Sequence, residues 1–299
     1  MKQPYPRLPD FKYRQPKTMA EALDVLARHP EQSRPYAGGT DCFVQIRDRR
    51  YLPAYIVDLK GIPELAEIQF DEKTGLRIGA TASMNSLMQH TQASAHYPVL
   101  MDSAREVAGY QLRTRATVVG NICNASPCGD TIGPCMVYAG VMHLVSKEGK
   151  RDVPLAEFFS GPGKIVMKTG EFAMRITLPV APEGTQGSYK SIGRNKMGDL
   201  AIAAVTVLGY PDKNCTSGYR FKIALTAVAP TVIFAEEAQV LLCEEKLDGS
   251  VIERAAQLCA EASKPITDIR GTAEYRKDMI RVLALRGLQE TCEKLGLRL

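Results

Sequence analysis

The sequence lacks three features that would point to a membrane, a secretory route or a nucleic acid. Its best apolar stretch, residues 200–208, falls well short of the roughly 20 residues that a membrane-spanning helix needs, so we expect a buried strand and no membrane span. The first residues have no apolar core like that of a secretory signal, which predicts a cytoplasmic protein. The net charge is only +5 with the signs interleaved, which argues against a dedicated nucleic-acid-binding protein.

The composition that remains is that of an ordinary globular protein, with 45% hydrophobic and 24% charged residues over 299 positions. These values exclude the collagen-like, coiled-coil, disordered and small disulfide-stapled classes. At about 150 residues per domain, we expect two domains or three small ones. The 8 cysteines could pair by number, but in a reducing compartment we expect free thiols, buried small residues or cluster ligands.

Local signals predict a strand-helix-strand block at the start of the chain. Thr18 and Glu21 form a capping box, and the apolar stripe behind them ends at His29, before a proline. Strands are expected over residues 34–37 and 54–59. The middle of the chain reads as mixed helix and strand, with a strand over residues 141–146.

Clustered Pro and Gly over residues 178–184 suggest a boundary. Strand-like sequence follows, and the last long helix is expected over residues 272–295, with Tyr275, Met279, Val282 and Leu283 on one face. Strands followed by helices predict an α+β unit. We therefore expect three units, over residues 1–60, 61–180 and 181–299.

Two Gly-containing segments stand in place of the common nucleotide motifs, since neither G-x-G-x-x-G nor a P-loop is found. The first spans residues 35–42, PYAGGTDC. Paired glycines after a strand let backbone N–H groups approach an anion, Thr40 adds a hydroxyl, and Asp41 could cap the next helix. The alternative is a tight strand-to-helix turn without a ligand.

The second segment, residues 117–131, reads TVVGNICNASPCGDT. Its short polar side chains and glycines could cradle a pyrophosphate, while Asp130 accepts from sugar hydroxyls. The alternative is a polar loop between packed elements.

Together the words AGGTD and TVVGNICNASPCGDT, about 80 residues apart, resemble the FAD-binding (medium) subunits of the molybdenum hydroxylase or xanthine dehydrogenase family, which includes the carbon monoxide dehydrogenase medium subunit. The likeness extends over nearly the whole chain, through residues 76–80, 108–113, 158–164 and 189–190. It implies an α+β protein: a PCMH-type (vanillyl-alcohol-oxidase-type) FAD-binding fold in two subdomains, plus a C-terminal α+β domain with an antiparallel sheet.

The resemblance also implies FAD-binding residues. Residues 37–41 and 117–121 would hold the pyrophosphate, Asp130 would bind at the adenosine ribose, and Lys190 would lie on the flavin side. Read alone, Lys190 would be a solvated surface lysine. The full set of expected cofactor-binding residues is Tyr36, Ala37, Gly38, Gly39, Thr40, Asp41, Thr117, Val118, Val119, Gly120, Asn121, Asn124, Ser126, Asp130 and Lys190.

One position departs from the family pattern: Val119 stands where a glycine is usual. This matters only if the position needs a positive φ, and we expect FAD binding to survive. Cys123 and Cys128 lie in the same segment and Cys135 follows shortly after it, without a nearby fourth cysteine, so we expect buried thiols here and no additional [4Fe–4S] cluster. The histidines show no ligand spacing, and no metal site is expected.

By this resemblance the chain is an electron-transfer subunit without catalytic residues of its own. Electrons from a large molybdopterin-binding subunit would pass through the [2Fe–2S] clusters of a small subunit to FAD here, and then to NAD or another acceptor. The sequence has no ferredoxin-type cysteine pattern and no room for a molybdopterin domain, so those groups are expected on the partners, in a dimer of heterotrimers.

Two other functions stay open at this point. One is a stand-alone PCMH-type flavin oxidoreductase with its own substrate, although no acid-base residues of a substrate domain stand out. The other is a scaffold or nucleic-acid module that uses the basic stretches at residues 47–50 and 113–115, although such short runs usually form solvated faces.

Overall fold

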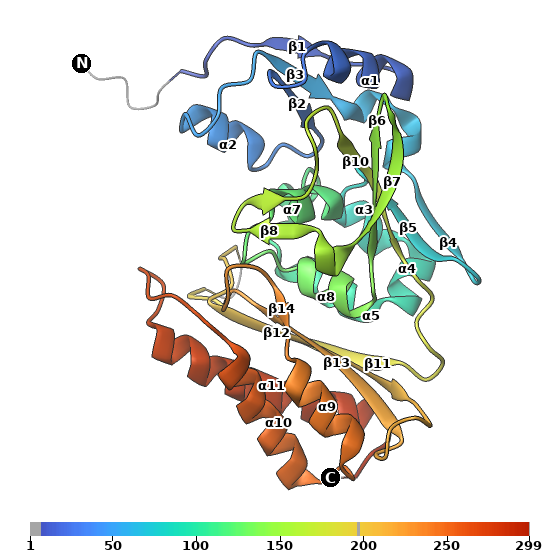
Figure 1. Ribbon diagram of the computed structural model, residues 1–299, viewed down its shortest axis with the longest axis vertical. Coiled ribbons are helices and arrows are strands. Elements are labelled where there is room, and N and C mark those ends of the chain that lie inside the picture. Colours follow the sequence, from blue (N-terminus) through green and yellow to red (C-terminus); the bar gives the residue numbers. More distant parts are fainter. Residues whose placement is uncertain (1–6, 196–197, 299) are drawn as a thin grey trace.

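A computed structural model describes residues 7–195 and 198–298 of the chain. Within them, three sheets of three, five and four strands and one two-stranded hairpin follow one another along the long axis (Figure 1). The N-terminal sheet lies at one end and the C-terminal helices lie at the other. This arrangement confirms the predicted mixed α+β class.

The first sheet is parallel, with the strand order β1-β3-β2, and α1 packs on it. Helix α1 begins where the capping box predicts, because Thr18 Oγ1 accepts from Glu21 N at 3.2 Å, and it ends before Pro30. The elements are β1 (Lys12–Arg14), α1 (Met19–Arg28), β2 (Ser33–Tyr36), α2 (Cys42–Arg47), β3 (Tyr55–Asp58), η1 (Leu59–Gly61) and η2 (Pro63–Ala66).

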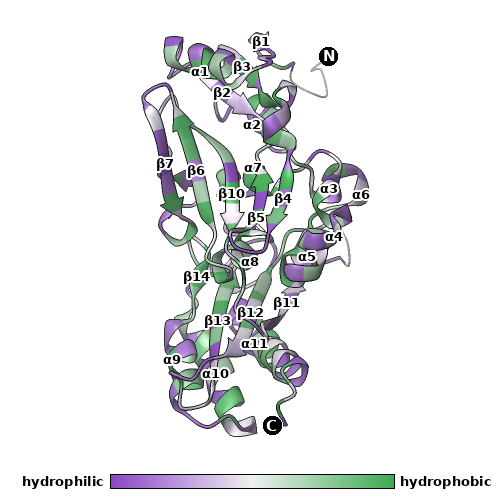
Figure 2. Ribbon diagram, turned by 90° about the vertical axis from the view of Figure 1, so that its right-hand side faces the viewer, coloured by the Kyte–Doolittle hydropathy of each residue, from purple (hydrophilic) through white to green (hydrophobic). Residues whose placement is uncertain are grey.

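The second sheet is antiparallel, with the order β4-β5-β10-β6-β7. Its edge strand β7 is hydrophilic, whereas β6 beside it is mostly apolar (Figure 2). The predicted strand over residues 141–146 is β6. The elements are β4 (Ile68–Asp71), β5 (Gly75–Gly79), α3 (Met84–Gln89), α4 (Thr91–His96), α5 (Pro98–Glu106), α6 (Tyr110–Arg113), α7 (Val118–Asn124), α8 (Ile132–Val137), β6 (Val141–Ser146), β7 (Gly149–Pro154), η3 (Leu155–Glu157), β8 (Phe159–Gly161), β9 (Lys164–Ile165) and β10 (Phe172–Leu178).

The third sheet is antiparallel, with the order β11-β12-β13-β14, and is covered on both faces. Helix α8 lies on the face toward the second sheet, and α9, α10 and α11 lie on the other face (Figure 1). Burial on both faces explains the continuous apolar run of β12. The elements are β11 (Gln186–Ile192), β12 (Ala203–Pro211), β13 (Tyr219–Thr226), β14 (Ile233–Phe234), α9 (Glu236–Glu244), α10 (Gly249–Ala262) and α11 (Ala273–Lys294).

The long helix predicted over residues 272–295 exists as α11, but the predicted buried face is wrong in part. Tyr275 is 39% exposed, whereas Arg276 is 2% exposed. The Arg276 guanidinium donates to the carbonyl of Ile202 at 2.5 Å and to the Asp268 carboxylate at 2.7 Å. These partners allow a charged side chain to occupy a core position, and this rotates the buried face.

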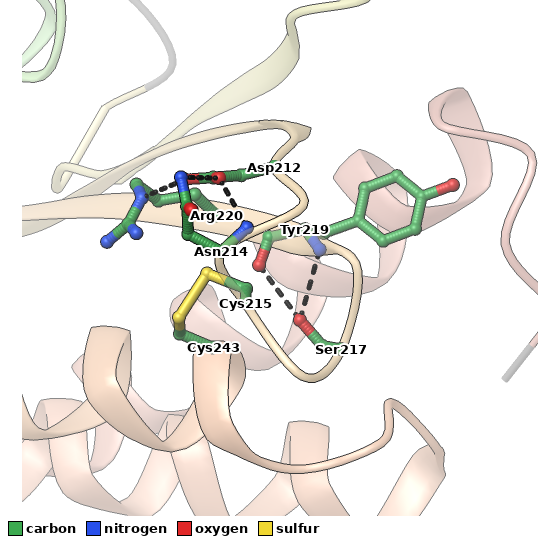
Figure 3. Close-up of a disulfide and its surroundings, with 7 residues drawn as sticks. All are labelled: Asp212, Asn214, Cys215, Ser217, Tyr219, Arg220 and Cys243. Atoms are coloured by element: carbon green, nitrogen blue, oxygen red, sulfur yellow. Dashed lines mark hydrogen bonds and ion pairs between the residues drawn. A yellow bond between two sulfur atoms is a disulfide. The ribbon is translucent and has the colours of Figure 1, made fainter.

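A disulfide joins Cys215 to Cys243 (Figure 3), which corrects the expectation that both are free and packed singly. Cys215 lies in the turn between β12 and β13, and Cys243 lies near the end of α9. They are 28 residues apart in the sequence, and their Cα atoms are 4.6 Å apart. Packing of α9 on β13 brings them together, which no local pattern could predict. The other cysteines are free.

Candidate FAD-binding site

The turn after β2 packs against the segment that leads into α7. A β-carbon on Gly38 would lie 2.1 Å from the Arg115 carbonyl oxygen, so no side chain fits there. Gly39 has a φ of 75°, and a β-carbon on it would lie 1.9 Å from the Tyr36 ring. Both positions therefore exclude a side chain, and at Gly38 the first segment meets the backbone that leads into the second.

The same turn presents a run of free backbone donors. Within the described residues, the N–H groups of Gly38, Gly39, Thr40 and Asp41 make no backbone hydrogen bond. Successive N–H groups of this kind form an anion-binding concavity. Asp41 occupies the cap position of α2, but its side chain makes no cap hydrogen bond, contrary to the prediction.

A further free backbone donor lies at the start of α7. Thr117 caps this helix, since its Oγ1 accepts from Gly120 N at 2.9 Å. The Val119 N–H makes no hydrogen bond in the part of the chain that the structure describes, whereas the isolated antiparallel bridge between Ser83 and Thr117 directs the Val118 N–H to the Ala82 carbonyl. Val119 has helical backbone without a positive φ, so valine in place of the usual glycine imposes no left-handed strain.

Side-chain hydrogen bonds hold the remaining polar residues of the second segment. Asn124 Oδ1 accepts from Gln45 Nε2 at 2.9 Å, which ties α7 to α2 across the two units. Asn121 Oδ1 accepts from the Thr131 hydroxyl at 2.8 Å. Ser126 Oγ accepts from Cys128 N at 3.3 Å. The site is thus largely ordered by the chain's own contacts.

Asp130 lies at the far end of this segment, against the third sheet. It is 6% exposed and accepts from the Tyr189 hydroxyl at 2.7 Å. Burial, with a contribution from the nearby Glu106 carboxylate, raises the pKa of Asp130 to about 6, although the Tyr189 hydrogen bond opposes the shift. A buried carboxylate with one donor can accept further hydrogen bonds, as from sugar hydroxyls.

The structure does not bring Lys190 to these residues. Successive strand residues point to opposite faces, so Tyr189 faces Asp130 while Lys190 faces α11. There the Lys190 ammonium pairs with the Glu290 carboxylate, which also pairs with Lys294. The other predicted residues gather in the two loops and at Asp130.

Contacts from other parts of the chain complete the site, and sequence reasoning missed them. The C-terminal unit reaches the second segment where Ala227 N donates to the Pro127 carbonyl at 2.8 Å. Lys60 Nζ donates to the Ala37 carbonyl at 3.2 Å, and both Gln45 and Tyr189 bind site residues directly. Tyr189 could have been found from strand alternation; the others carry no sequence signal.

Cys123, Cys128 and Cys135 lie in the second segment or just after it. Among residues 7–195 and 198–298, no three His, Cys, Asp or Glu side chains gather so that they could hold a metal ion. Cys135 is buried in α8, and burial raises the pKa of the Cys123 thiol to about 12. Such thiols stay protonated and uncharged.

None of the helices in the described part of the chain is both long and apolar enough to span a membrane.

Arg113, from the basic stretch at residues 113–115, is 8% exposed and donates to the carbonyls of Arg105 and Val107. It therefore caps α5 and adds nothing to a basic surface.

Comparison with known proteins agrees with this geometry. Residues 9–181 match the family described as the FAD binding domain in molybdopterin dehydrogenase, and residues 187–291 match the CO dehydrogenase flavoprotein C-terminal domain. The carbon monoxide dehydrogenase medium chain of Afipia carboxidovorans is 31% identical over 93% of this chain and 96% of that one. A xanthine dehydrogenase FAD-binding subunit of Escherichia coli is 28% identical over 95% and 97%.

A solved structure shows the same fold. The carbon monoxide dehydrogenase of Hydrogenophaga pseudoflava that lacks the Mo-pyranopterin moiety has a chain that superposes with a TM-score of 0.90, at 28% identity, over 96% of this chain and 99% of that one. The family match covers more than half of the sequence, and the likeness runs through both the FAD-binding and C-terminal parts. The chain therefore belongs to the FAD-binding medium subunits of the molybdenum hydroxylase family.

Proposed function

We propose that this chain binds one FAD through its two glycine-containing loops and serves as the electron-transfer subunit of a molybdopterin-containing hydroxylase. The observation that carries this proposal is the backbone contact at Gly38, which brings the free N–H groups of residues 38–41 close to the start of α7, where the Val119 N–H is free as well. A pyrophosphate is a dianion that needs such donors. The donor set therefore fits FAD, which when bound supplies reversible electron transfer.

Each part of the site has a proposed role. The N–H groups at residues 38–41 and 119 would hold the pyrophosphate, and Asp130 would accept from the adenosine ribose. Thr117, Gly120 and Asn121 would fix the start of α7 and its neighbourhood. Tyr36, Asn124 and Ser126 would line the cofactor. Lys190 is left out, because its ammonium pairs with Glu290 on the opposite face of the sheet.

The proposed partners follow from the family to which the chain belongs. We propose a large molybdopterin-binding subunit and a small [2Fe–2S] subunit, assembled as a dimer of heterotrimers, with electrons entering from the clusters and leaving to NAD or another acceptor. We also propose a cytoplasmic location and units over residues 1–60, 61–180 and 181–299. The medium-chain relatives are the support for this assembly.

The test begins with the chain purified alone, stripped of flavin and titrated with FAD. Stoichiometric return of the visible flavin absorbance is expected, and no binding after FAD is added back would refute the proposal. Affinity purification of the tagged chain from its native cells then tests the partners. Recovery of a molybdenum-containing and an iron–sulfur subunit is expected, whereas recovery of an active flavoprotein alone would favour a stand-alone oxidoreductase.

A further inference from the structure

The side chain of Lys60 contacts the turn after β2, whose residues 38–41 carry the free N–H groups. Its Nζ donates to the Ala37 carbonyl at 3.2 Å and to Asp58 Oδ1 at 2.5 Å. It also lies 3.7 Å from the centroid of the Tyr36 ring. Three contacts on different sides hold the ammonium in one place, although Lys60 follows β3 and is 23 residues away from Ala37 in sequence.

The Asp58 carboxylate holds the Lys60 ammonium in place. Its side chain is 1% exposed, and it accepts from the Tyr13 hydroxyl and from Lys60 N as well as from the Lys60 ammonium. A buried carboxylate needs such partners to remain in the fold. Because Asp58 neutralises Lys60, the pair contributes little net charge to the neighbouring turn.

The hydrogen bond to Ala37 sets the direction of one peptide group. In a trans peptide the C=O and the following N–H point in opposite directions, and the described residues contain no cis peptide bond. With the Ala37 carbonyl held on Lys60, the Gly38 N–H must point away from Lys60. The Gly38 N–H makes no backbone hydrogen bond in the described part of the chain.

We propose that Lys60 is a positioning residue: it locks the Ala37–Gly38 peptide so that the Gly38 N–H faces the cofactor pyrophosphate. This inference rests on the proposed FAD site and deepens it. Lys60 acts through the peptide and not through its charge. Without this donor the Ala37–Gly38 peptide could rotate. FAD would then have to order the peptide when it binds, and the entropy cost of that ordering would weaken FAD binding.

The experiment compares variants of the full chain. Lys60→Met removes the donor at similar length, Lys60→Arg restores a cationic donor, and Lys12→Met is the control, since Lys12 lies over Tyr55 in the same sheet without touching the turn. If Lys60→Met fails to fold, Asp58→Asn with Lys60→Met keeps the pair neutral. The readouts are the FAD Kd of flavin-free protein, its melting temperature, and the phosphorus NMR shifts of bound FAD.

We expect Lys60→Met to raise the FAD Kd at least about tenfold, as for loss of one hydrogen bond from a charged group. The shifts of the bound pyrophosphate should move, Lys60→Arg should largely restore both, and the effect should vary little with salt. Lys12→Met should match the wild type.

Several outcomes would overturn the inference. One is an unchanged Kd with unchanged phosphorus shifts; another is a Kd that rises only where the melting temperature falls, without a change in the shifts. An effect that is large at low salt and vanishes at high salt would mean that Lys60 attracts the phosphates by charge. Failure of the wild type itself to bind FAD would refute the proposed function instead.

Discussion

Gly38 and Arg115 meet backbone to backbone: a β-carbon on Gly38 would stand 2.1 Å from the Arg115 carbonyl oxygen. This contact joins the turn after β2 of the N-terminal sheet to the residues just before the α7 cap, Thr117. The two halves of the proposed pyrophosphate site depend on it. Any side chain at position 38 must push them apart.

Gly38→Ala should therefore abolish tight FAD binding and lower the free energy of unfolding by about 1–3 kcal/mol, as overpacking does. The measurement is flavin content after purification, together with denaturant unfolding of the flavin-free protein. Gly249→Ala is the matched control, because a β-carbon there meets nothing within 4 Å. A Gly38→Ala protein that keeps its flavin would contradict the proposed contact between the loops.

Asp130 should make the stability of the flavin-free protein depend on pH. Its pKa is raised by burial from 3.8 to about 6, so the folded state favours the protonated acid. The free energy of unfolding should fall as pH rises from about 4 to about 6, by up to about 3 kcal/mol from this residue. Asp130→Asn should remove this component. Parallel stability curves for the two proteins would show that Asp130 titrates normally.

Lys190→Met should leave the flavin content and its spectrum unchanged. The Lys190 ammonium pairs with Glu290 on the α11 face, so its loss should cost only about 0–1 kcal/mol, as for partly exposed ion pairs. Glu290→Gln should have a similar effect on stability. A changed flavin spectrum or potential in Lys190→Met alone would return this lysine to the flavin.

Reduction of the Cys215–Cys243 disulfide should lower stability without releasing flavin. The bond ties the turn between β12 and β13 to α9 (Figure 3), at the end of the molecule opposite to the N-terminal sheet (Figure 1). Its contribution to the free energy of unfolding should be about 3 kcal/mol. Thiol titration of the unfolded, unreduced protein should count the 6 free cysteines. A count of all 8 would show that the bond does not form in the cell.

Local signals predicted the parts of this structure that depend on neighbours in sequence. The capping box at Thr18, the strand over residues 141–146 and the glycine turn all rest on interactions within a few residues. The loops of the site could be predicted from the sequence because their close packing requires glycine at fixed positions. Their proximity came from family resemblance and not from the residues themselves.

Long-range contacts explain what was missed. The Cys215–Cys243 pair depends on how α9 packs, and burial of Arg276 depends on carbonyls of distant strands. Lys190 was expected at the flavin from the family resemblance alone, and the structure places it in β11, where alternation along the strand turns Tyr189 toward Asp130 and Lys190 toward α11. Lys60 is an ordinary lysine in sequence, and only the fold places it under Ala37.

The central claim is that the free N–H groups of both loops bind the FAD pyrophosphate. Amide NMR of the labelled, flavin-free chain during FAD titration tests it most directly. We predict that the amide resonances of residues 38–41 and 119 shift together and saturate at one FAD per chain, while that of Gly249 stays in place. Saturation with FAD without a shift of either loop would contradict the account.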